Sequence, residues 1–240
     1  MKRNIFENGG HMSAKSIRNR SPFLFAAAAC VLLSLVPIER AFAVYPDRIV
    51  KIVVPFAPGG GTDIVARTLA QEMAKDLGQS VIVENRPGAG TIVGTQTVAM
   101  SEPDGYTLLM GTFANAVNPS LYAKLPYDPQ KDFAPVALVA RSFNIVVVNS
   151  KSSIKSIADL IAAAKAGPDK LSYGTYGTGT SAHLAGELFK SMTKVNLTMI
   201  PYKGAAPAIT DLIGGQIQVM FTTVASAAAR SKPGNCARWR

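Results

Sequence analysis

Three consecutive glycines, Gly59 to Gly61, followed by Thr62 and Asp63, are the residues of this sequence best suited to binding chemistry. They join an apolar run that predicts a buried strand, Ile49 to Val54, to a helix predicted from Ile64 onward. The first N–H groups of a helix have no partner within it, and the helix dipole is positive there. Glycine also lets a ligand approach the bare backbone. The loop therefore predicts an anion site, although the same glycines would also suit a tight turn without a ligand.

The spacing around these glycines excludes two nucleotide-binding motifs. A P-loop places Gly-Lys-Ser/Thr after its spacer, whereas here Gly61 is followed by Thr62 and Asp63 with no lysine. A dinucleotide fingerprint needs G-x-G-x-x-G, which Pro58 to Asp63 does not supply. The loop favours a small anion held by backbone dipoles, with no cofactor and no catalytic residue.

A second stretch, Ser172 to His183, repeats this arrangement: a short predicted strand, then glycines and hydroxyl side chains, then a helix over 182–192. We expect the two helix N-termini to face each other across a cleft and hold one ligand. An exported α/β hydrolase or transferase is the enzymatic alternative. It lacks a G-x-S-x-G nucleophile elbow, and Ser181 and His183, two positions apart on a helix, would point in different directions.

Strands and helices alternate along the rest of the chain. Further strands are predicted at Val81–Val83, Thr107–Met110, Val136–Val139, Ile145–Val148, Leu197–Ile200 and Val219–Phe221. Helices are predicted at 64–77, 92–100, 157–166 and 207–213. This alternation predicts an α/β fold with parallel sheets, in which ligands bind beyond the carboxyl ends of the strands. The loops that leave strands on that side are Ala57–Asp63, Asn85–Gly90 and Gly111–Asn118.

The sequence also predicts how the chain is divided. We expect a first lobe over 44–143 with the first ligand loop, and a second lobe over 144–229 with the second. The stretch from Leu121 to Pro135 is rich in Pro, Asp and Tyr and is predicted to be irregular. Ser156-Ile157-Ala158-Asp159 has the pattern of a capping box, which predicts a structural helix that begins there and ends near Gly167.

The N-terminal 43 residues have the pattern of an export signal. Arg18 and Arg20 precede an apolar run from Phe23 to Val36, and Ala41-Phe42-Ala43 has the small-x-small form of a signal-peptidase site. The run is short for a membrane span. We therefore expect cleavage after Ala43 and a periplasmic location, with Met12 as an alternative start to Met1.

The formal net charge of +10 is concentrated at the two ends of the chain. Residues 1–43 carry six Lys or Arg against two Glu, and residues 230–240 carry four Lys or Arg, which leaves +2 on the body. No basic face is predicted there, so we do not expect nucleic acid to bind. The two cysteines, Cys30 and Cys236, lie in the leader and the tail, so no disulfide, cysteine nucleophile or metal site is expected in the body.

Taken together, several motifs in order resemble the Bug family, the periplasmic substrate-binding receptors of tripartite tricarboxylate transporters. The motifs are Pro55 to Asp63, Glu84 to Gly90, Pro103 to Tyr106, Tyr173 to Leu184 and Pro201 to Gly204. The resemblance runs from about Tyr45 to Ala229. It implies a two-lobed type II periplasmic-binding fold that closes, as a monomer, on a tricarboxylate, a dicarboxylate, an acidic amino acid or an aromatic acid. It also allows a sensory role.

The resemblance further implies which residues hold the ligand. The expected ligand-binding residues are Phe56, Ala57, Gly60, Thr62, Asp63, Thr112, Asn115, Gly177, Thr178, Gly179, Thr180, Ser181, His183 and Tyr202. Asp63 would pair with a ligand ammonium or, alternatively, only favour the helix dipole. His183 would line the cleft or, alternatively, bond to its own helix. Lys203 would pair with the ligand charge or, alternatively, point to water.

The family pattern breaks after Ala229, where members continue for roughly another eighty residues, which complete the sheet of the first lobe. Residues 230–240 form an aberrant basic tail that resembles nothing in the family. One permissible coding of the tail, read in another frame, gives the family-like Val-Lys-Ala-Gly-Gln-Leu-Arg-Ala-Leu-Ala. We therefore hypothesise a frameshift near Ala229, an incomplete first lobe and, as one alternative, a nonfunctional truncated product.

Overall fold

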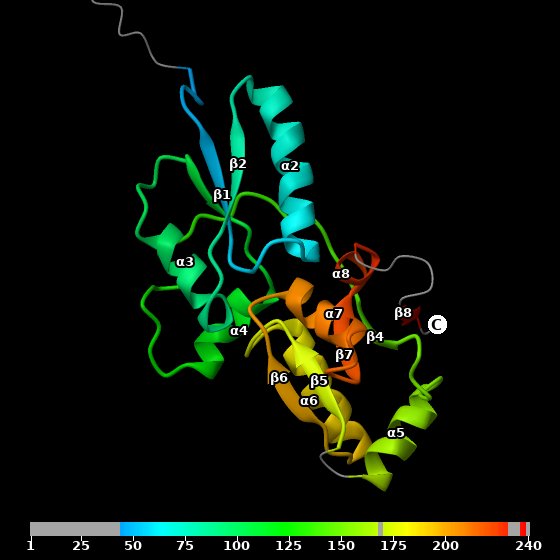
Figure 1. Ribbon diagram of the computed structural model, residues 1–240. Coiled ribbons are helices and arrows are strands. Elements are labelled where there is room, and N and C mark those ends of the chain that lie inside the picture. Colours follow the sequence, from blue (N-terminus) through cyan, green and yellow to red (C-terminus); the bar gives the residue numbers. More distant parts are fainter. Residues whose placement is uncertain (1–43, 168–169, 230–235, 239–240) are drawn as a thin grey trace, which may run out of the picture. The chain divides into compact units, whose positions relative to one another are not determined.

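The computed structural model describes residues 44–167, 170–229 and 236–238, and the predicted export signal lies outside them. Two separate sheets organise these residues (Figure 1). The first has three strands in the order β2-β1-β3, and the second has five in the order β6-β5-β7-β4-β8. The described part contains no helix with the length and apolarity needed to cross a membrane.

The first sheet is parallel throughout. Its elements are β1 (Val50–Val54), α2 (Gly61–Leu77), β2 (Val81–Asn85), the 3-10 turn η1 (Ala89–Thr91), α3 (Ile92–Ala99) and β3 (Thr107–Leu109). Because β2 and β3 lie on opposite sides of β1 and such crossovers are right-handed, α2 and α3 cover opposite faces. This explains why Val50, Val53 and Val54 on the central strand are fully buried. Gly78 ends α2 in the left-handed conformation, as its position predicts.

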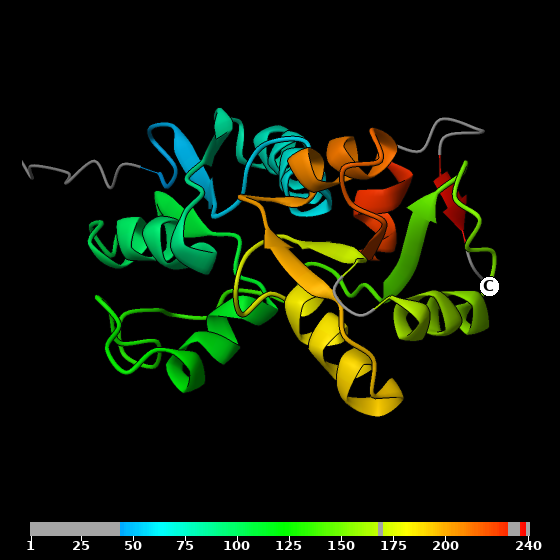
Figure 2. The same cartoon turned by 60° about the horizontal axis from the view of Figure 1, so that its bottom comes forward.

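The second sheet contains the same unit. Its elements are β4 (Asn144–Asn149), α5 (Ile157–Ala166), β5 (Ser172–Thr175), α6 (Ser181–Thr193), β6 (Thr198–Pro201), α7 (Ala205–Ile213), β7 (Val219–Thr223), α8 (Val224–Ala228) and β8 (Cys236–Arg238). Strand β5 pairs in parallel with β6 and β7, in the order β6-β5-β7. Helices α6 and α7 lie on opposite sides of these strands, as Figure 2 shows. Each sheet thus carries one strand-helix-strand-helix-strand unit with the same strand order.

The second sheet also contains antiparallel pairs, formed by β4 with β7 and with β8. Strand β8 lies in the predicted basic tail, so three residues of that tail form a strand that the sequence did not predict. Ser156 is the N-cap of helix α5, and its hydroxyl accepts a hydrogen bond from the N–H of Asp159 at 3.0 Å. The predicted N-cap is confirmed there.

The predicted loop from Gly111 to Asn118 is wrong, because α4 (Phe113–Leu121) occupies most of it. The Oδ1 atom of Asn115 accepts a hydrogen bond from the N–H of Thr112 at 2.8 Å, which secures the first turn. The Nδ2 atom of Asn115 donates to Thr95 on α3 at 2.7 Å. Helix α4 is therefore stabilised by a side-chain contact with a distant helix, which no local pattern reveals.

The predicted strand Val136–Val139 is also wrong. The segment from Ala134 to Phe143 has no regular secondary structure. Val136 is 83% exposed and Leu138 is 70% exposed, so this apolar run has no strand beside it among the described residues. A strand needs a hydrogen-bonding neighbour, and β-forming residues alone do not supply one.

One buried apolar cluster spans both sheets. It joins Ile52, Val54 and Met110 of the first sheet region to residues of α7 and β7. The rings of Phe56 and Tyr176 meet edge to face within it, with centroids 6.4 Å apart. The loops that follow β1 and β5 are therefore fixed against each other by apolar packing.

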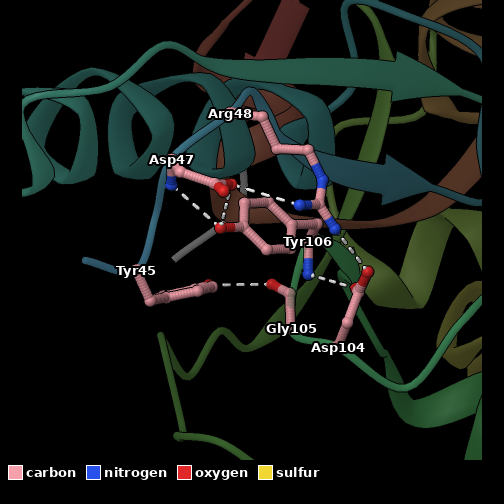
Figure 3. Close-up of polar contacts among 6 residues, drawn as sticks. All are labelled: Tyr45, Asp47, Arg48, Asp104, Gly105 and Tyr106. Atoms are coloured by element: carbon pink, nitrogen blue, oxygen red, sulfur yellow. Dashed lines mark hydrogen bonds and ion pairs between the residues drawn. The ribbon is translucent and has the colours of Figure 1, made fainter. Parts of the chain in front are cut away.

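The start of the described chain is bound to the turn before β3 (Figure 3). The guanidinium of Arg48 lies 3.7 Å from the centre of the Tyr106 ring and forms ion pairs with Asp47 and Asp104. The hydroxyl of Tyr106 donates to Asp47, and the hydroxyl of Tyr45 donates to the Gly105 carbonyl. This cluster lies at the amino ends of β1 and β3, away from the carboxyl ends where ligands are expected.

Candidate functional site

A small pocket of about 240 Å³ lies at the carboxyl ends of strands from both sheets. Its walls come from the loop after β2, the turn after β5 and the loop after β6, with one residue each from the ends of β1 and α4. The lining residues are Pro55, Gly88, Ala89, Gly90, Thr91, Tyr122, Tyr176, Gly177, Thr178, Pro201, Tyr202 and Lys203. Clefts for drug-sized ligands occupy roughly 300–1,000 Å³, so this pocket suits a smaller molecule.

The loop after β2 has an unusual backbone. Four successive residues have positive φ: Gly88 (145°), Ala89 (44°), Gly90 (59°) and Thr91 (88°). Side chains disfavour this region, so Ala89 and Thr91 are strained, and such strain is concentrated at binding and switching sites. A neighbouring side chain stabilises this strained backbone: the amide of Asn118 donates a hydrogen bond to the hydroxyl of Thr91 at 3.1 Å.

The walls of the small pocket offer donors and one positive charge. Lys203 is the only charged residue among the lining residues, and no aspartate or glutamate is among them. The N–H groups of Gly90 and Thr178 and the hydroxyl of Tyr122 have no hydrogen-bond partner among the residues that the structure describes. Unpaired donors beside a positive charge favour an anion.

A much larger cavity, of about 1610 Å³, lies on the other side of Tyr176, which lines both. Eight of the expected ligand-binding residues line it: Phe56, Gly60, Thr62, Asp63, Thr112, Asn115, Thr180 and Ser181. The N-termini of α2 and α6 therefore do share one cavity. Its walls also include the apolar stripe Val65, Leu69 and Met73 of α2 and the exposed Val136 and Leu138. Its size and apolar lining fit a small anion less well than the small pocket does.

The carboxylate of Asp63 forms hydrogen bonds within the protein. It is 3% exposed, and its carboxylate accepts hydrogen bonds from Gly59 N–H (2.9 Å), Arg67 Nε (3.0 Å) and Asn85 Nδ2 (2.9 Å). Burial alone would raise the pKa of Asp63, but these donors outweigh it and hold the pKa below its usual value. Asp63 therefore shapes the glycine loop and joins α2 to the end of β2.

The backbone amides of the first glycine loop are also largely engaged. The N–H of Ala57 donates to the Lys203 carbonyl at 2.8 Å, and the N–H of Gly61 donates to Ser226 Oγ at 3.0 Å. Ala57 lines neither pocket. The N–H of Ala57 is therefore already bonded to the second half of the chain, and its contact with a ligand stays a prediction.

Some residues of the second glycine turn line the small pocket, and others form hydrogen bonds that begin α6. Gly177 and Thr178 line the small pocket. The hydroxyl of Thr180 caps α6 by accepting from His183 N–H at 3.4 Å, and His183 Nδ1 accepts from Gly179 N–H at 3.2 Å. Neither Gly179 nor His183 lines a pocket. Gly179 and His183 bond to each other instead, and their contact with a ligand stays a prediction.

Two tyrosines border the small pocket with their hydroxyls turned away from it. Tyr176 donates to Thr222 Oγ1 and accepts from Thr223 N–H at 2.9 Å, and its burial raises its pKa. Tyr202 donates to Asp211 at 2.7 Å. Burial, together with that carboxylate, raises the pKa of Tyr202 to about 12. Both residues contribute ring surface rather than donors.

Sequence reasoning missed most of the small pocket. Of its lining residues, only Gly177, Thr178 and Tyr202 were among the expected ligand-binding residues. The rule for carboxyl ends did place the glycine-rich Asn85–Gly90 connection on the ligand side, but none of its residues was named as ligand-binding. Tyr122 gave no such indication, since it follows a helix that was not predicted.

Comparisons with known proteins identify the family of this chain. The family model for the tripartite tricarboxylate transporter family receptor matches residues 65–238. The chain belongs to this family. One receptor relative, Protein BugT from Bordetella pertussis, is 40% identical over 193 residues, covering 80% of this chain and 59% of the relative. The periplasmic binding protein BugD is 37% identical with a TM-score of 0.73, over 81% of this chain and 65% of that one.

Solved receptor structures share the fold. Rpa4515 of R. palustris, solved with adipate, is 37% identical with a TM-score of 0.78, over 81% of this chain and 65% of that one. MatC from Rhodopseudomonas palustris, with bound malate, is 35% identical with a TM-score of 0.74, over 81% and 67%. The mixed α/β periplasmic-binding fold is thereby confirmed. The chain spans 54% to 66% of the lengths of the first three curated relatives.

Proposed function

We propose that this chain is a solute receptor that binds a small carboxylate in the small pocket and delivers it to the membrane components of a tripartite tricarboxylate transporter. The observation that supports this proposal most directly is the composition of the pocket wall. The wall has donors without a partner among the described residues, one lysine and no acidic side chain. A carboxylate is an acceptor-only group with a negative charge, so it complements this wall. Structures of the related receptors with adipate and malate support the proposal.

We also propose that the chain is exported to the periplasm after cleavage of residues 1–43 and that it acts as a monomer; the likeness to the periplasmic binding protein BugD supports the location. N-terminal sequencing of the exported protein should then begin at Val44. A protein that keeps its leader, or whose sequence begins elsewhere, contradicts the predicted cleavage after Ala43. Size-exclusion chromatography with light scattering measures the oligomeric state.

The hydrolase alternative gains no support from the site. The hydroxyl of Ser181 donates to Asn144 Oδ1 at 3.3 Å, whereas His183 accepts from Gly179. A nucleophile needs a base within hydrogen-bond reach, and these two side chains have separate partners. A screen of ester substrates should therefore show no turnover.

The test is a thermal-shift screen of the purified 240-residue chain with malate, adipate, citrate, aspartate and nicotinate. A bound acid at one hundred times its Kd stabilises the folded state by about 2.7 kcal/mol, so Tm rises. Malamide, which keeps the shape of malate without its charges, should leave Tm unchanged. If circular dichroism shows a folded chain and no acid raises its Tm, the proposal is wrong.

A further inference from the structure

We infer that Asn118 of α4 is a positioning residue of the small pocket: it holds the strained turn from Gly88 to Thr91 in the conformation that presents the N–H of Gly90 to the pocket. Asn118 lines neither pocket, so it acts through the turn and does not touch the ligand. The effect of Asn118 on binding rests on the proposed function, whereas its effect on the turn is measurable without a ligand.

The peptide group between Gly90 and Thr91 is held at both of its polar atoms. Its carbonyl oxygen, on Gly90, accepts a hydrogen bond from Asn118 Nδ2 at 3.4 Å. Its N–H, on Thr91, donates to the Gly88 carbonyl at 3.1 Å. The same Asn118 nitrogen donates to the Thr91 hydroxyl at 3.1 Å. Because a peptide group is planar, holding both of its edges restrains the backbone of Gly90 beside it.

Asn118 also joins this turn to a third segment. Its Nδ2 atom donates to the hydroxyl of Tyr127 at 3.4 Å, and Tyr127 belongs to the irregular stretch that follows α4. The Tyr127 ring is buried and packs edge to face on Phe133, with centroids 5.8 Å apart. The asparagine amide is therefore anchored in packed surroundings, so the turn cannot rotate without breaking bonds to them.

The oxygen of the Asn118 amide shows that its orientation serves the turn. Asn118 is fully buried, and its Oδ1 atom has no hydrogen-bond partner among the described residues. Reversing the amide would place Oδ1 against the carbonyl oxygen of Gly90, which can only accept, so the nitrogen must face the turn. Oδ1 then lies beside the second glycine turn, where a Cβ atom on Gly179 would be 3.1 Å away.

An unpaired buried acceptor disfavours the folded state, and an apolar side chain of similar shape would avoid it. A leucine at this position would fill similar space, but it could not hold the carbonyl of Gly90 or the hydroxyl of Thr91. Asn118 is therefore explained by the conformation that it imposes on the turn, and not by its contribution to stability.

Amide hydrogen exchange of the full chain, followed by NMR, measures the hold on the turn. In Asn118→Leu, the protection of the Thr91 N–H against exchange should fall by about tenfold, because the turn opens locally. The Lys51 N–H, bonded to the Tyr106 carbonyl at 2.8 Å, reports any general loss of stability. Protection at Thr91 should fall by more than protection at Lys51.

Two further variants separate the hydrogen bond from the loss of an asparagine. Adding Thr91→Val to Asn118→Leu should lower the protection no further, because the shared hydrogen bond is already lost. Asn149→Leu is the matched control: its amide donates to the carbonyls of Leu212 (3.0 Å) and Ile213 (2.7 Å), and Asn149 lines neither pocket. It should lower Tm and leave the protection at Thr91 in step with that at Lys51.

Calorimetry with malate and adipate, or with whichever other acid of the thermal-shift screen binds best, measures the effect on the pocket. Asn118→Leu should weaken binding by about tenfold, because the ligand must then order the turn itself. Asn149→Leu should keep the wild-type affinity. A residue that only stabilised the fold would not produce this difference between two destabilised variants.

The outcomes separate this inference from the proposed function. If protection at Thr91 falls no more than protection at Lys51 in Asn118→Leu, the inference is overturned, whether or not an acid binds. If protection falls but the affinity for the acid is unchanged, Asn118 does not serve the pocket and the inference is again overturned. If protection falls and no acid binds the folded wild type, Asn118 holds the turn as inferred and the proposed function is wrong.

Discussion

Gly90 and Thr178 meet so closely that no side chain fits between them: a Cβ atom on Gly90 would lie 2.4 Å from the Thr178 carbonyl oxygen. The two residues belong to loops from different sheets, and neither N–H group has a hydrogen-bond partner within the described part of the chain. The glycine therefore has two roles, since it adopts a positive φ and allows the loops to approach. The small pocket exists because this contact is possible.

Gly90→Ala should abolish the rise in Tm that carboxylates cause. The methyl group would strain a backbone with φ of 59° and push the Thr178 loop away. Gly78→Ala is the matched control, because Gly78 has φ of 64° and nothing within 4 Å of its Cβ position. Both variants should lose roughly 1–2 kcal/mol to backbone strain. A normal ligand response in Gly90→Ala would contradict the contact.

Asp63→Asn should destabilise the fold by about 1–3 kcal/mol. The NH₂ group of the asparagine would replace one carboxylate oxygen and would face hydrogen-bond donors, which would then lack an acceptor. The three donors come from Gly59, Arg67 and Asn85. Urea unfolding measures the loss. Asp76→Asn, on the exposed side of the same helix, should change stability far less. Equal losses in the two variants would show that the buried network contributes nothing.

Asp63 should also make stability depend on pH. Its pKa in the folded chain is lowered, so its stabilising contribution is complete above its unfolded pKa of about 3.9 and is lost as pH falls through the folded value. The free-energy difference between wild type and Asp63→Asn should shrink in acid. Urea titrations from about pH 6 to pH 2 measure it. A difference that stays constant over this range would contradict the prediction.

Tyr176→Phe should cost about 1–3 kcal/mol, because the Thr223 N–H and the Thr222 hydroxyl lose a partner in a buried place. The packing of its ring against Phe56 is retained. Tyr106→Phe removes a phenol whose contacts are exposed to water, and we expect a smaller loss there. The shift of the urea midpoint relative to wild type measures the loss of stability in each variant. If Tyr106→Phe is the more damaging, the buried hydroxyl is not what stabilises the β7 end.

The sequence by itself determined the features that depend on local chemistry. The apolar run at β1 predicts its strand, the stripe Val65, Leu69 and Met73 predicts α2, and Ser156 predicts the start of α5. Each depends on neighbours within a few residues along the chain, so periodicity and capping rules are sufficient. The alternation of these elements, together with the motifs, was enough to indicate the family and its fold.

Only the tertiary structure decided which of the predicted residues are free to bind. Asp63 accepts a hydrogen bond from Asn85, and the N–H of Ala57 donates to the Lys203 carbonyl, so both are engaged by partners far away in the sequence. The pocket instead combines Gly90 with Thr178, which only the packing of two sheets brings together. Hydrogen-bond partners far apart in the sequence leave no local pattern, because what matters is the direction of each group after the sheets have packed.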